Sequence, residues 1–237
     1  MCGDATNIDD VQKVLGDLQP ALFITDPPYG VAIGDKNVML YSKGTGRRNE
    51  EHLQGDQSIK EVEELWRRSF PIARQVLSPG TPYYIFGPQG GDLGLLLLLL
   101  RDSDLAARHV LTWVKNRAAF SFGRLDYDYA HEPIMYGWVK GAGHPWYAKE
   151  PQTSCLYYDR PAASKLHPTM KPVALIAHLI TNSTKKDDTV FDVFGGSGTT
   201  LIACEKTGRQ CRMMEIDPHY CDVIVKRYED FTGASRT

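Results

Sequence analysis

Short apolar runs alternate with amphipathic stretches along most of the chain. The apolar runs have the length and composition of buried parallel strands and lie at residues 21–25, 82–86, 109–114, 133–139, 189–194 and 211–216. Helical patterns lie between them, at 59–76, 93–101, 173–182, 199–207 and 220–231. The pattern at 93–101 is apolar on nearly all sides, so we expect that helix to be buried. This alternation predicts a doubly wound α/β fold.

Two segments have no such period. Residues 31–56 are polar and rich in glycine, and residues 141–166 contain Gly, Pro and aromatic residues without a repeat. Long irregular loops in a compact domain usually carry function. We expect one domain over residues 1–237, with 31–56 as a loop insertion that contacts a partner and 141–166 as a short recognition region.

Composition narrows the class of protein. The net charge is −2, but residues 105–175 hold nine Lys or Arg against five Asp or Glu, so this part is the expected polyanion-facing one. The five cysteines are odd in number and contain no C-x-x-C pair, which argues against a disulfide framework or a metal site. The leucine run 95–100 is far shorter than the ~20 residues of a membrane span. We expect a cytoplasmic protein without a metal or a membrane segment.

A glycine-rich turn follows the apolar run at 189–194. The stretch "FDVFGGSGTT" (191–200) has glycines at 195, 196 and 198, just before a predicted helix. Glycines let a backbone approach a ligand closely, and the first N–H groups of a helix then point at that ligand. A plain strand-to-helix turn would have the same residues, so this stretch alone leaves both interpretations open.

An acidic residue ends the next predicted strand. In "MMEIDPHY", Glu215 closes the apolar run, and an acidic residue in that place binds ribose hydroxyls in nucleoside-binding α/β folds. Asp217 before Pro218 also has the pattern of a helix N-cap. No phosphate-binding G-x-x-x-x-G-K-[ST] loop is present in the sequence, which favours an adenosine-containing ligand without a triphosphate.

The first apolar run ends in "DPPY" (26–29). Because proline fixes φ and lacks an N–H, this stretch holds the Asp26 carboxylate and the Pro27 carbonyl as two adjacent acceptors. Two acceptors suit an –NH₂ group, and Tyr29 offers a flat face to a planar ring. A turn that merely ends the strand is the alternative.

A fourth stretch, "HPTMKP" (167–172), places Lys171 at the start of a predicted helix. There a lysine could bind an anion or could simply lie on the surface.

Together the four stretches resemble the S-adenosylmethionine-dependent DNA amino-methyltransferases. The order, with DPPY before FGGSG, resembles the permuted beta group, and "HEPIMYGW", "KLHPTMKP" and "GSGTTLIACE" resemble phage and prophage DNA modification methylases of restriction-modification type. Val193 departs from the proline that is common there. The resemblance implies a Rossmann-like class I methyltransferase fold, with a mostly parallel twisted sheet, one antiparallel strand and helices on both faces.

The resemblance also implies roles for individual residues. The catalytic residues would be Asp26, Pro27, Pro28 and Tyr29. The residues that bind S-adenosylmethionine would be Asp4, Ala5, Thr169, Lys171, Asp192, Phe194, Gly195, Gly196, Ser197, Gly198, Thr199, Glu215 and Asp217. Residues expected to contact double-stranded DNA are Lys43, Arg47, Arg48, Lys115, Arg117 and Arg124.

The implied reaction is methylation of the N6 amine of an adenine flipped out of the duplex. The same two acceptors would suit the N4 amine of cytosine, and a silent DNA-binding module would keep the same fold. Asp in the first position of the motif favours adenine in this family. Two short recognition segments in a chain of 237 residues suggest that a homodimer covers the duplex.

Overall fold

We describe the fold from a computed structural model, which covers residues 1–29, 59–118, 126–161 and 170–233. The strands are β1 (Leu22–Thr25), β2 (Pro82–Phe86), β3 (His109–Val114), β4 (His131–Trp138), β5 (Cys155–Tyr157), β6 (Thr189–Asp192) and β7 (Gln210–Met213). The helices are α1 (Ile8–Leu15), α3 (Ile59–Gln75), α4 (Asp92–Asp102), α5 (Val173–Ser183), α6 (Thr199–Thr207) and α7 (Pro218–Thr232).

The strands form one twisted sheet in the order β5-β3-β4-β2-β1-β6-β7. β4 runs antiparallel to both β2 and β3, while every other pairing among the described strands is parallel. This confirms the predicted mostly parallel sheet with an antiparallel strand. The order reverses between β1 and β6, where ligands bind in open α/β sheets because the following loops diverge.

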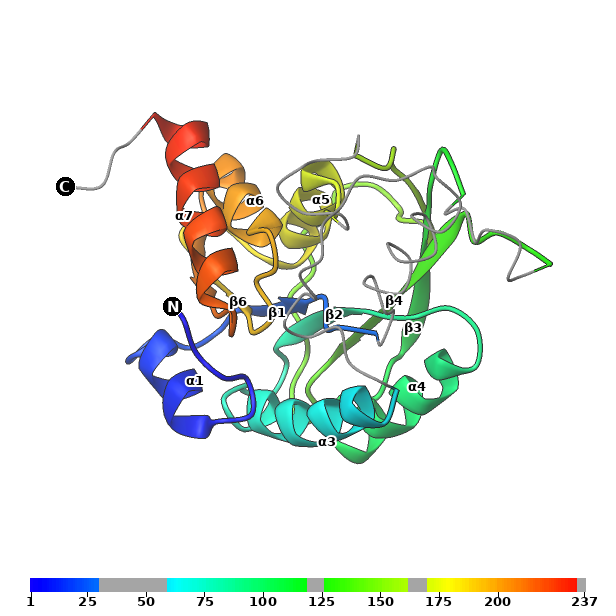
Figure 1. Cartoon of the computed structure of the whole chain (residues 1–237), viewed down its shortest axis with the longest axis horizontal. Helices are drawn as coiled ribbons and strands as arrows, with labels where there is room; N and C mark the ends of the chain where they lie inside the picture. The colour runs from blue at the N-terminus through cyan, green and yellow to red at the C-terminus, as the bar shows by residue number, and fades with distance from the viewer. Residues whose placement is uncertain (30–58, 119–125, 162–169, 234–237) are drawn as a thin grey trace, which may run out of the picture.

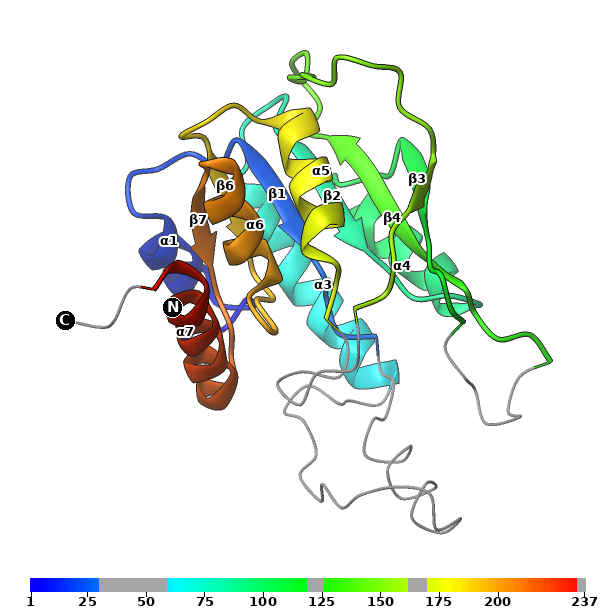
Figure 2. The ribbon, with the colours of Figure 1, turned by 90° about the horizontal axis from the view of Figure 1, so that it is seen from above.

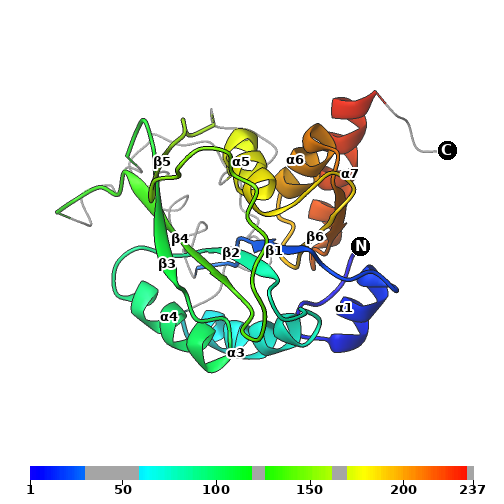
Figure 3. The ribbon, with the colours of Figure 1, turned by 180° about the vertical axis from the view of Figure 1, so that it is seen from behind.

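Alternating side chains of the central strands build a core on each face of the sheet. Phe23, Tyr83 and Ile85 pack with α1, α3 and α4, whereas Leu22, Ile24 and Tyr84 pack with α5 and α6. Figure 1 shows these two helical layers on opposite sides of the sheet, with α7 beside α6, and Figure 3 shows the same layers from behind. The layers explain why β1 and β2 are buried at every position.

The N-terminal residues extend the sheet at its β7 edge. Cys2 forms a parallel bridge with Glu215, and the amide of Gly3 donates to the Glu215 carbonyl at 2.9 Å. Seen from above, the N-terminus lies close to α7 (Figure 2). Residues 1–3 and the chain after β7 are therefore neighbours in space.

Some sequence expectations were wrong in detail. β3 is not buried throughout, because His109 and Val110 are exposed near the edge of the sheet. α4 is not buried on all sides, since Leu98 is half-exposed. The pattern search missed α1 and the three-residue β5, which lies within the segment 141–166 that was expected to be irregular. None of the described helices is long and apolar enough to cross a membrane.

The segment 141–166 divides between the two ends of the sheet. Trp138 pairs with Pro82 at the start of β2, so residues just after β4 lie at the end opposite to Asp26. There His144 stacks on Trp138 at 3.7 Å between ring centroids, and the Tyr147 amide donates to the Asn182 carbonyl. β5 then runs parallel to β3 and returns the chain to the end of the sheet where Asp26 lies.

Candidate active site

The DPPY stretch begins directly after β1, at the carboxyl end of the central strand. Thr25 is buried, and its hydroxyl donates to Oδ1 of Asp192 at 2.8 Å. The indole Nε1 of Trp66, from α3, donates to the carbonyl of Pro28 at 3.1 Å. The loop is therefore fixed from two directions, which restricts where the Asp26 carboxylate and the Pro27 carbonyl can lie.

The glycine-rich turn follows β6, the parallel neighbour of β1. Phe23 pairs with Phe191, which brings Asp26 and Gly195 to the same edge of the sheet although they are far apart in sequence. The backbone of Gly196 and Gly198 has φ of +51° and +76°, a conformation that glycine adopts without a steric penalty. A Cβ on Gly195 would lie 2.9 Å from the Met214 carbonyl oxygen, so a side chain cannot be accommodated there without movement.

Glu215, which follows β7, lies against the glycine-rich turn. Its Oε2 accepts from the Gly196 amide at 2.7 Å, and its Oε1 accepts from the Asp217 amide at 3.0 Å. Burial raises the pKa of Glu215, and these backbone donors counteract part of that rise. The predicted ribose-binding residue therefore lies against the predicted glycine turn.

Two groups predicted to bind the cofactor also have hydrogen-bond partners within the chain. Asp217 caps α7 by accepting from the His219 amide at 2.8 Å, as its place before Pro218 also allowed. Asp192 is buried, and its carboxylate accepts from Thr25, from Thr200 at 2.7 Å and from the Phe194 amide at 3.1 Å. Burial raises the pKa of Asp192 to about 7 against the effect of these donors. Its carboxylate thus joins the ends of β1 and β6.

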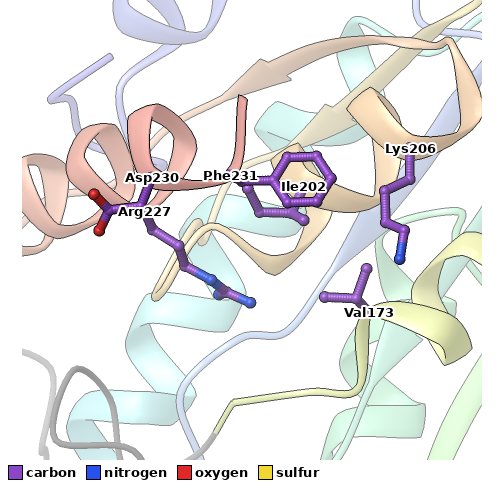
Figure 4. Close-up of a pocket in the computed structure, with 6 residues that line it drawn as sticks. All are labelled: Val173, Ile202, Lys206, Arg227, Asp230 and Phe231. Carbon is purple, nitrogen blue, oxygen red and sulfur yellow. The ribbon is translucent and has the colours of Figure 1, made fainter. Parts of the chain in front are cut away.

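Arg227 supports the glycine turn and was missed by the sequence reasoning. Its Nη1 donates to the Ser197 carbonyl at 2.8 Å and contacts the hydroxyls of Ser197 and Thr199, each at 3.1 Å. These two hydroxyls were predicted to meet the cofactor, yet both residues are buried. Beside Arg227 lies an open groove of about 370 Å³ (Figure 4), lined by Val173, Ile202, Lys206, Arg227, Asp230 and Phe231.

Residues near the N-terminus join the same edge of the sheet. Asp4 lies next to Gly3, which is bonded to Glu215, and Ala5 is buried in the core. The Asp4 carboxylate accepts from the Thr6 amide at 2.8 Å, while the Asp4 amide donates to Asp10 at 3.0 Å. The structure thus brings Asp4 and Ala5 close to Glu215, as the predicted adenine-binding role requires.

Lys171 lies beside Asp26. Lys171 precedes α5 and is buried, and its Nζ contacts Oδ2 of Asp26. The same Nζ lies 3.2 Å from Oε2 of Glu132, as an ionic contact without an aligned hydrogen bond. Its ammonium is thus engaged by two carboxylates of the chain, and its expected contact with the cofactor carboxylate stays a prediction.

Lys115 belongs to the same group of charges and not to the surface. It follows β3, and its Nζ lies 2.6 Å from Oε1 of Glu132, the second residue of β4. Only 4% of its side chain is exposed, so it cannot lie along a DNA backbone as predicted. Asp26, Lys171, Glu132 and Lys115 form a chain of alternating charges, which we call the charge row.

Burial and these contacts set the protonation of the charge row. Burial raises the pKa of Asp26, the Lys171 ammonium counteracts this, and Glu132 adds to it. Burial alone would lower the pKa of Lys171, but Asp26 and Glu132 raise it overall. Burial opposes ionisation of Glu132 as well, yet Lys171 and Lys115 hold its pKa below the ordinary value. Lys171 is thus held in its charged form between two carboxyl groups.

Tyr29 completes the wall next to Asp26. Its hydroxyl donates to Oδ1 of Asp26, and both burial and this carboxylate hold the Tyr29 pKa well above its ordinary value. Nζ of Lys171 lies 5.7 Å from the Tyr29 ring and 5.2 Å from the Phe86 ring. Two aromatic rings therefore flank the ion pair, and the tyrosine remains a neutral donor.

Comparison with known proteins gives the family. A family model for N6 and N4 methyltransferases, described as DNA methylase, matches residues 21–226. The chain belongs to the DNA methylase family. It is 25% identical over 230 residues to the Type II methyltransferase M2.MboI of Moraxella bovis, covering 89% of this chain and 81% of that protein. It is 24% identical to M2.DpnII of Streptococcus pneumoniae, covering 93% and 87%.

Solved structures show the same fold at low sequence identity. The M1.HpyAVI–SAM complex superposes with a TM-score of 0.68 and 23% identity, covering 96% of this DNA methylase and 97% of that chain. The cytosine-N4-specific PvuII DNA methyltransferase superposes with a TM-score of 0.71 and 17% identity, covering 99% and 86%. These likenesses confirm the predicted Rossmann-like class I methyltransferase fold.

The other expected DNA contacts of this DNA methylase have mixed outcomes. Lys43, Arg47, Arg48 and Arg124, with the segment 31–56, lie outside the described residues, and so does Thr169. Arg117 is exposed just after β3, at the same end of the sheet as Asp26. Close to it, the Asn116 side chain accepts from the Arg160 amide at 3.1 Å. Within the described part of the chain, no group of three or more metal-binding side chains gathers.

Proposed function

We propose that this DNA methylase transfers a methyl group from S-adenosylmethionine to the N6 amine of an adenine flipped out of double-stranded DNA. The observation that carries the proposal is the adjacency of Asp26, at the end of β1, to the Gly195–Gly196 turn at the end of β6. A target amine and a methyl donor held at these two strand ends would be neighbours.

The residues present fit an S-adenosylmethionine molecule. We assign it to the backbone of Phe194, Gly195 and Gly196, where the absence of side chains leaves room, and to Glu215, whose carboxylate could accept from ribose hydroxyls. We assign the adenine side of that site to Asp4 and Ala5, which follow Gly3, a residue bonded to Glu215. When bound, the cofactor supplies an electrophilic methyl group. The M1.HpyAVI structure was solved with this molecule, which supports the assignment.

The chain's own residues then prepare the amine. The lone pair of an exocyclic amine is delocalised into the ring, so the amine is a weak nucleophile. Acceptance of its two hydrogens by Asp26 and the Pro27 carbonyl favours a pyramidal nitrogen and stabilises the positive charge that develops as the N–C bond forms and the S–C bond breaks. The proton leaves afterwards, so the protein's work is mainly positioning.

Tyr29 is proposed to support the flipped base. Flipping costs a few kcal/mol, and stacking on an aromatic ring returns about 1–3 kcal/mol per base. The Tyr29 hydroxyl donates to Oδ1 of Asp26, the oxygen that the amine would need. The incoming amine would therefore take over a position that the tyrosine fills beforehand.

The test is a methylation assay that identifies the product. Purified protein, tritiated S-adenosylmethionine and genomic DNA lacking methylation are incubated, and the DNA is digested to nucleosides. We expect label in N6-methyl-2′-deoxyadenosine. Label in N4-methyl-2′-deoxycytidine would instead support cytosine as the target base, as for the cytosine-N4-specific PvuII enzyme. Binding of S-adenosylhomocysteine and DNA without any methyl transfer would favour a silent DNA-binding module.

A further inference from the structure

Glu132 lies at the centre of the charge row and has no role in the function proposed so far. Its two carboxylate oxygens contact different cations: Oε1 is 2.6 Å from Nζ of Lys115, and Oε2 is 3.2 Å from Nζ of Lys171. Exposure of these side chains is low, at 16% for Glu132, 8% for Lys171 and 4% for Lys115. A buried carboxylate that joins two buried cations is costly to maintain unless all its contacts are made.

The strands themselves place Glu132 between these cations. In the β3–β4 ladder Trp113 pairs with Glu132, and the Lys115 amide donates to the Ala130 carbonyl at 2.8 Å. The Lys115 ammonium lies 5.1 Å from the Trp113 ring. The register of a hairpin therefore fixes the distance from Glu132 to Lys115, while Lys171 reaches the same carboxylate from the segment before α5.

We propose that Glu132 is a positioning residue for methyl transfer: it holds Lys171 against Asp26 and offsets the positive charge that Lys171 brings there. The inference rests on the proposed function of Asp26 as the acceptor of the amine. Lys115 in turn anchors Glu132, so the row ends on a cation that is far from the reacting atoms.

The charge balance explains why Lys171 needs this partner. An unopposed ammonium on Oδ2 would withdraw charge from the Asp26 carboxylate, weaken its acceptance of the amine hydrogens and oppose the positive charge that develops on nitrogen. Charges interact strongly in such a buried environment. Because Glu132 offsets Lys171, Asp26 keeps its strength as an acceptor while its orientation is still fixed by the ion pair.

The other groups around Asp26 do not supply this balance. Tyr29, from the same loop, is a neutral donor to Oδ1. Asp192, at the end of β6, uses its carboxylate for Thr25, Thr200 and Phe194. Among the described residues, Glu132, from β4, is thus the carboxylate that contacts Lys171 in addition to Asp26.

The test compares kcat for methyl transfer in three variants: Glu132→Gln, Lys115→Met, and Lys115→Met with Glu132→Gln. We expect Glu132→Gln to lower kcat on the order of 10–100-fold, as for the coupling energy between members of one salt-bridge network. The dissociation constant of S-adenosylhomocysteine and the KM for DNA should change by less than about twofold, because Glu132 contacts neither ligand. Removing Lys115 as well should recover part of kcat, since the excess positive charge is reduced.

Glu132→Gln leaves the buried Lys115 ammonium without its carboxylate partner, and this could impair folding. A second comparison avoids that effect. Lys115→Met and the double variant both lack that ammonium, so they differ only in Glu132. We expect the double variant to have a kcat about tenfold or more below that of Lys115→Met, for the same loss of a charged partner. Equal kcat values in these two proteins would overturn the proposal, as would a Glu132→Gln protein that keeps wild-type kcat.

A titration separates this inference from the proposed reaction. The Asp26 carboxyl is followed by ¹³C NMR in the wild type and in Glu132→Gln. Because the Glu132 charge raises the pKa of Asp26, its removal should lower that pKa. If the Asp26 pKa falls in Glu132→Gln but the wild type transfers no methyl group, the proposed reaction is contradicted. The coupling of Glu132 to Asp26 would still be supported. An unchanged Asp26 pKa would refute the coupling, whatever the activity.

Discussion

The hydroxyl of Thr25 donates a hydrogen bond of 2.8 Å to Oδ1 of Asp192, although 167 positions separate the two residues. Thr25 is the last residue of β1 and immediately precedes Asp26, whereas Asp192 ends β6 and precedes the glycine turn. This buried contact therefore connects the proposed amine-binding loop to the proposed cofactor-binding loop. Their relative position depends on this hydrogen bond as well as on the strand pairing.

Removal of the Thr25 hydroxyl should destabilise the fold and disturb the distance between the two loops. We expect Thr25→Val to lower the free energy of unfolding by about 1–3 kcal/mol, because Asp192 loses a donor in a buried place. Urea unfolding measures the change. Thr25→Ser keeps the hydroxyl and is the matched control, so equal losses in both variants would contradict a role for the hydrogen bond.

Ionisation of Asp192 should give the stability a specific pH dependence. Its pKa is about 7 in the folded protein, against about 4 in an unfolded chain. Between pH ~4 and pH ~7 the folded state holds a proton that the unfolded state has released. The contribution of Asp192 to the free energy of unfolding is therefore complete below pH ~4 and is lost as the pH rises through ~7.

The free energy of unfolding is measured in urea for the wild type and for Asp192→Asn, each at pH 5 and at pH 8. The wild type should lose more stability than the variant over this range, since the amide does not titrate. The difference isolates Asp192 from Asp26 and Glu215, whose pKa values are also raised. Parallel pH profiles for the two proteins would mean that Asp192 does not titrate in this window.

Gly195 should be needed for cofactor binding. A Cβ there would meet Met213 and the Met214 carbonyl oxygen, both at 2.9 Å, so the turn must shift. We expect Gly195→Ala to weaken S-adenosylhomocysteine binding about tenfold or more, as for loss of at least one good hydrogen bond. Isothermal titration measures it. Gly91→Ala is the control, since its Cβ would meet nothing within 4 Å, and an equal affinity in the two variants would argue against this site.

Part of this site could be predicted from the sequence, for a simple reason. The family resemblance put the DPPY stretch, the glycine turn and Glu215 in one site, and they meet because the carboxyl ends of adjacent parallel strands lie at one edge of a sheet. The charge row could not be predicted, because Lys115 has the appearance of a surface cation until β3 pairs with β4. The charge row forms only when β3 pairs with β4 and when Lys171, 56 residues after Lys115, contacts Glu132.

The same distinction holds for the fold. Short apolar runs identified β1, β2, β3, β4, β6 and β7, and the signal is clear in β1, β2 and β6 because these central strands are buried on both faces. β5 has three residues and one buried side chain, so it has no detectable period. α1 did have a signal: Asn7 caps it by accepting from the Asp9 amide, and Val11 and Leu15 are its buried residues, four positions apart.

The Tyr29 ring, and not its hydroxyl, should be required for methyl transfer. Tyr29→Ala removes the stacking face, and we expect kcat/KM to fall about 10–100-fold, in line with about 1–3 kcal/mol of stacking. Tyr29→Phe loses the hydroxyl contact with Asp26, which the amine is proposed to displace, and should keep activity within a few-fold. An inactive Phe variant would show that the hydroxyl, and not only the ring, takes part in the reaction.

The most direct test of the account is methyl transfer by Asp26→Ala. Asp26 contributes one of the two proposed acceptors, and cofactor binding is assigned to other residues, so the variant should bind S-adenosylhomocysteine with nearly wild-type affinity. With tritiated S-adenosylmethionine and unmethylated DNA, we expect no label above background in the variant and clear labelling by the wild type. Labelling by Asp26→Ala at a rate close to that of the wild type would contradict the assignment of Asp26 as the group that receives the amine.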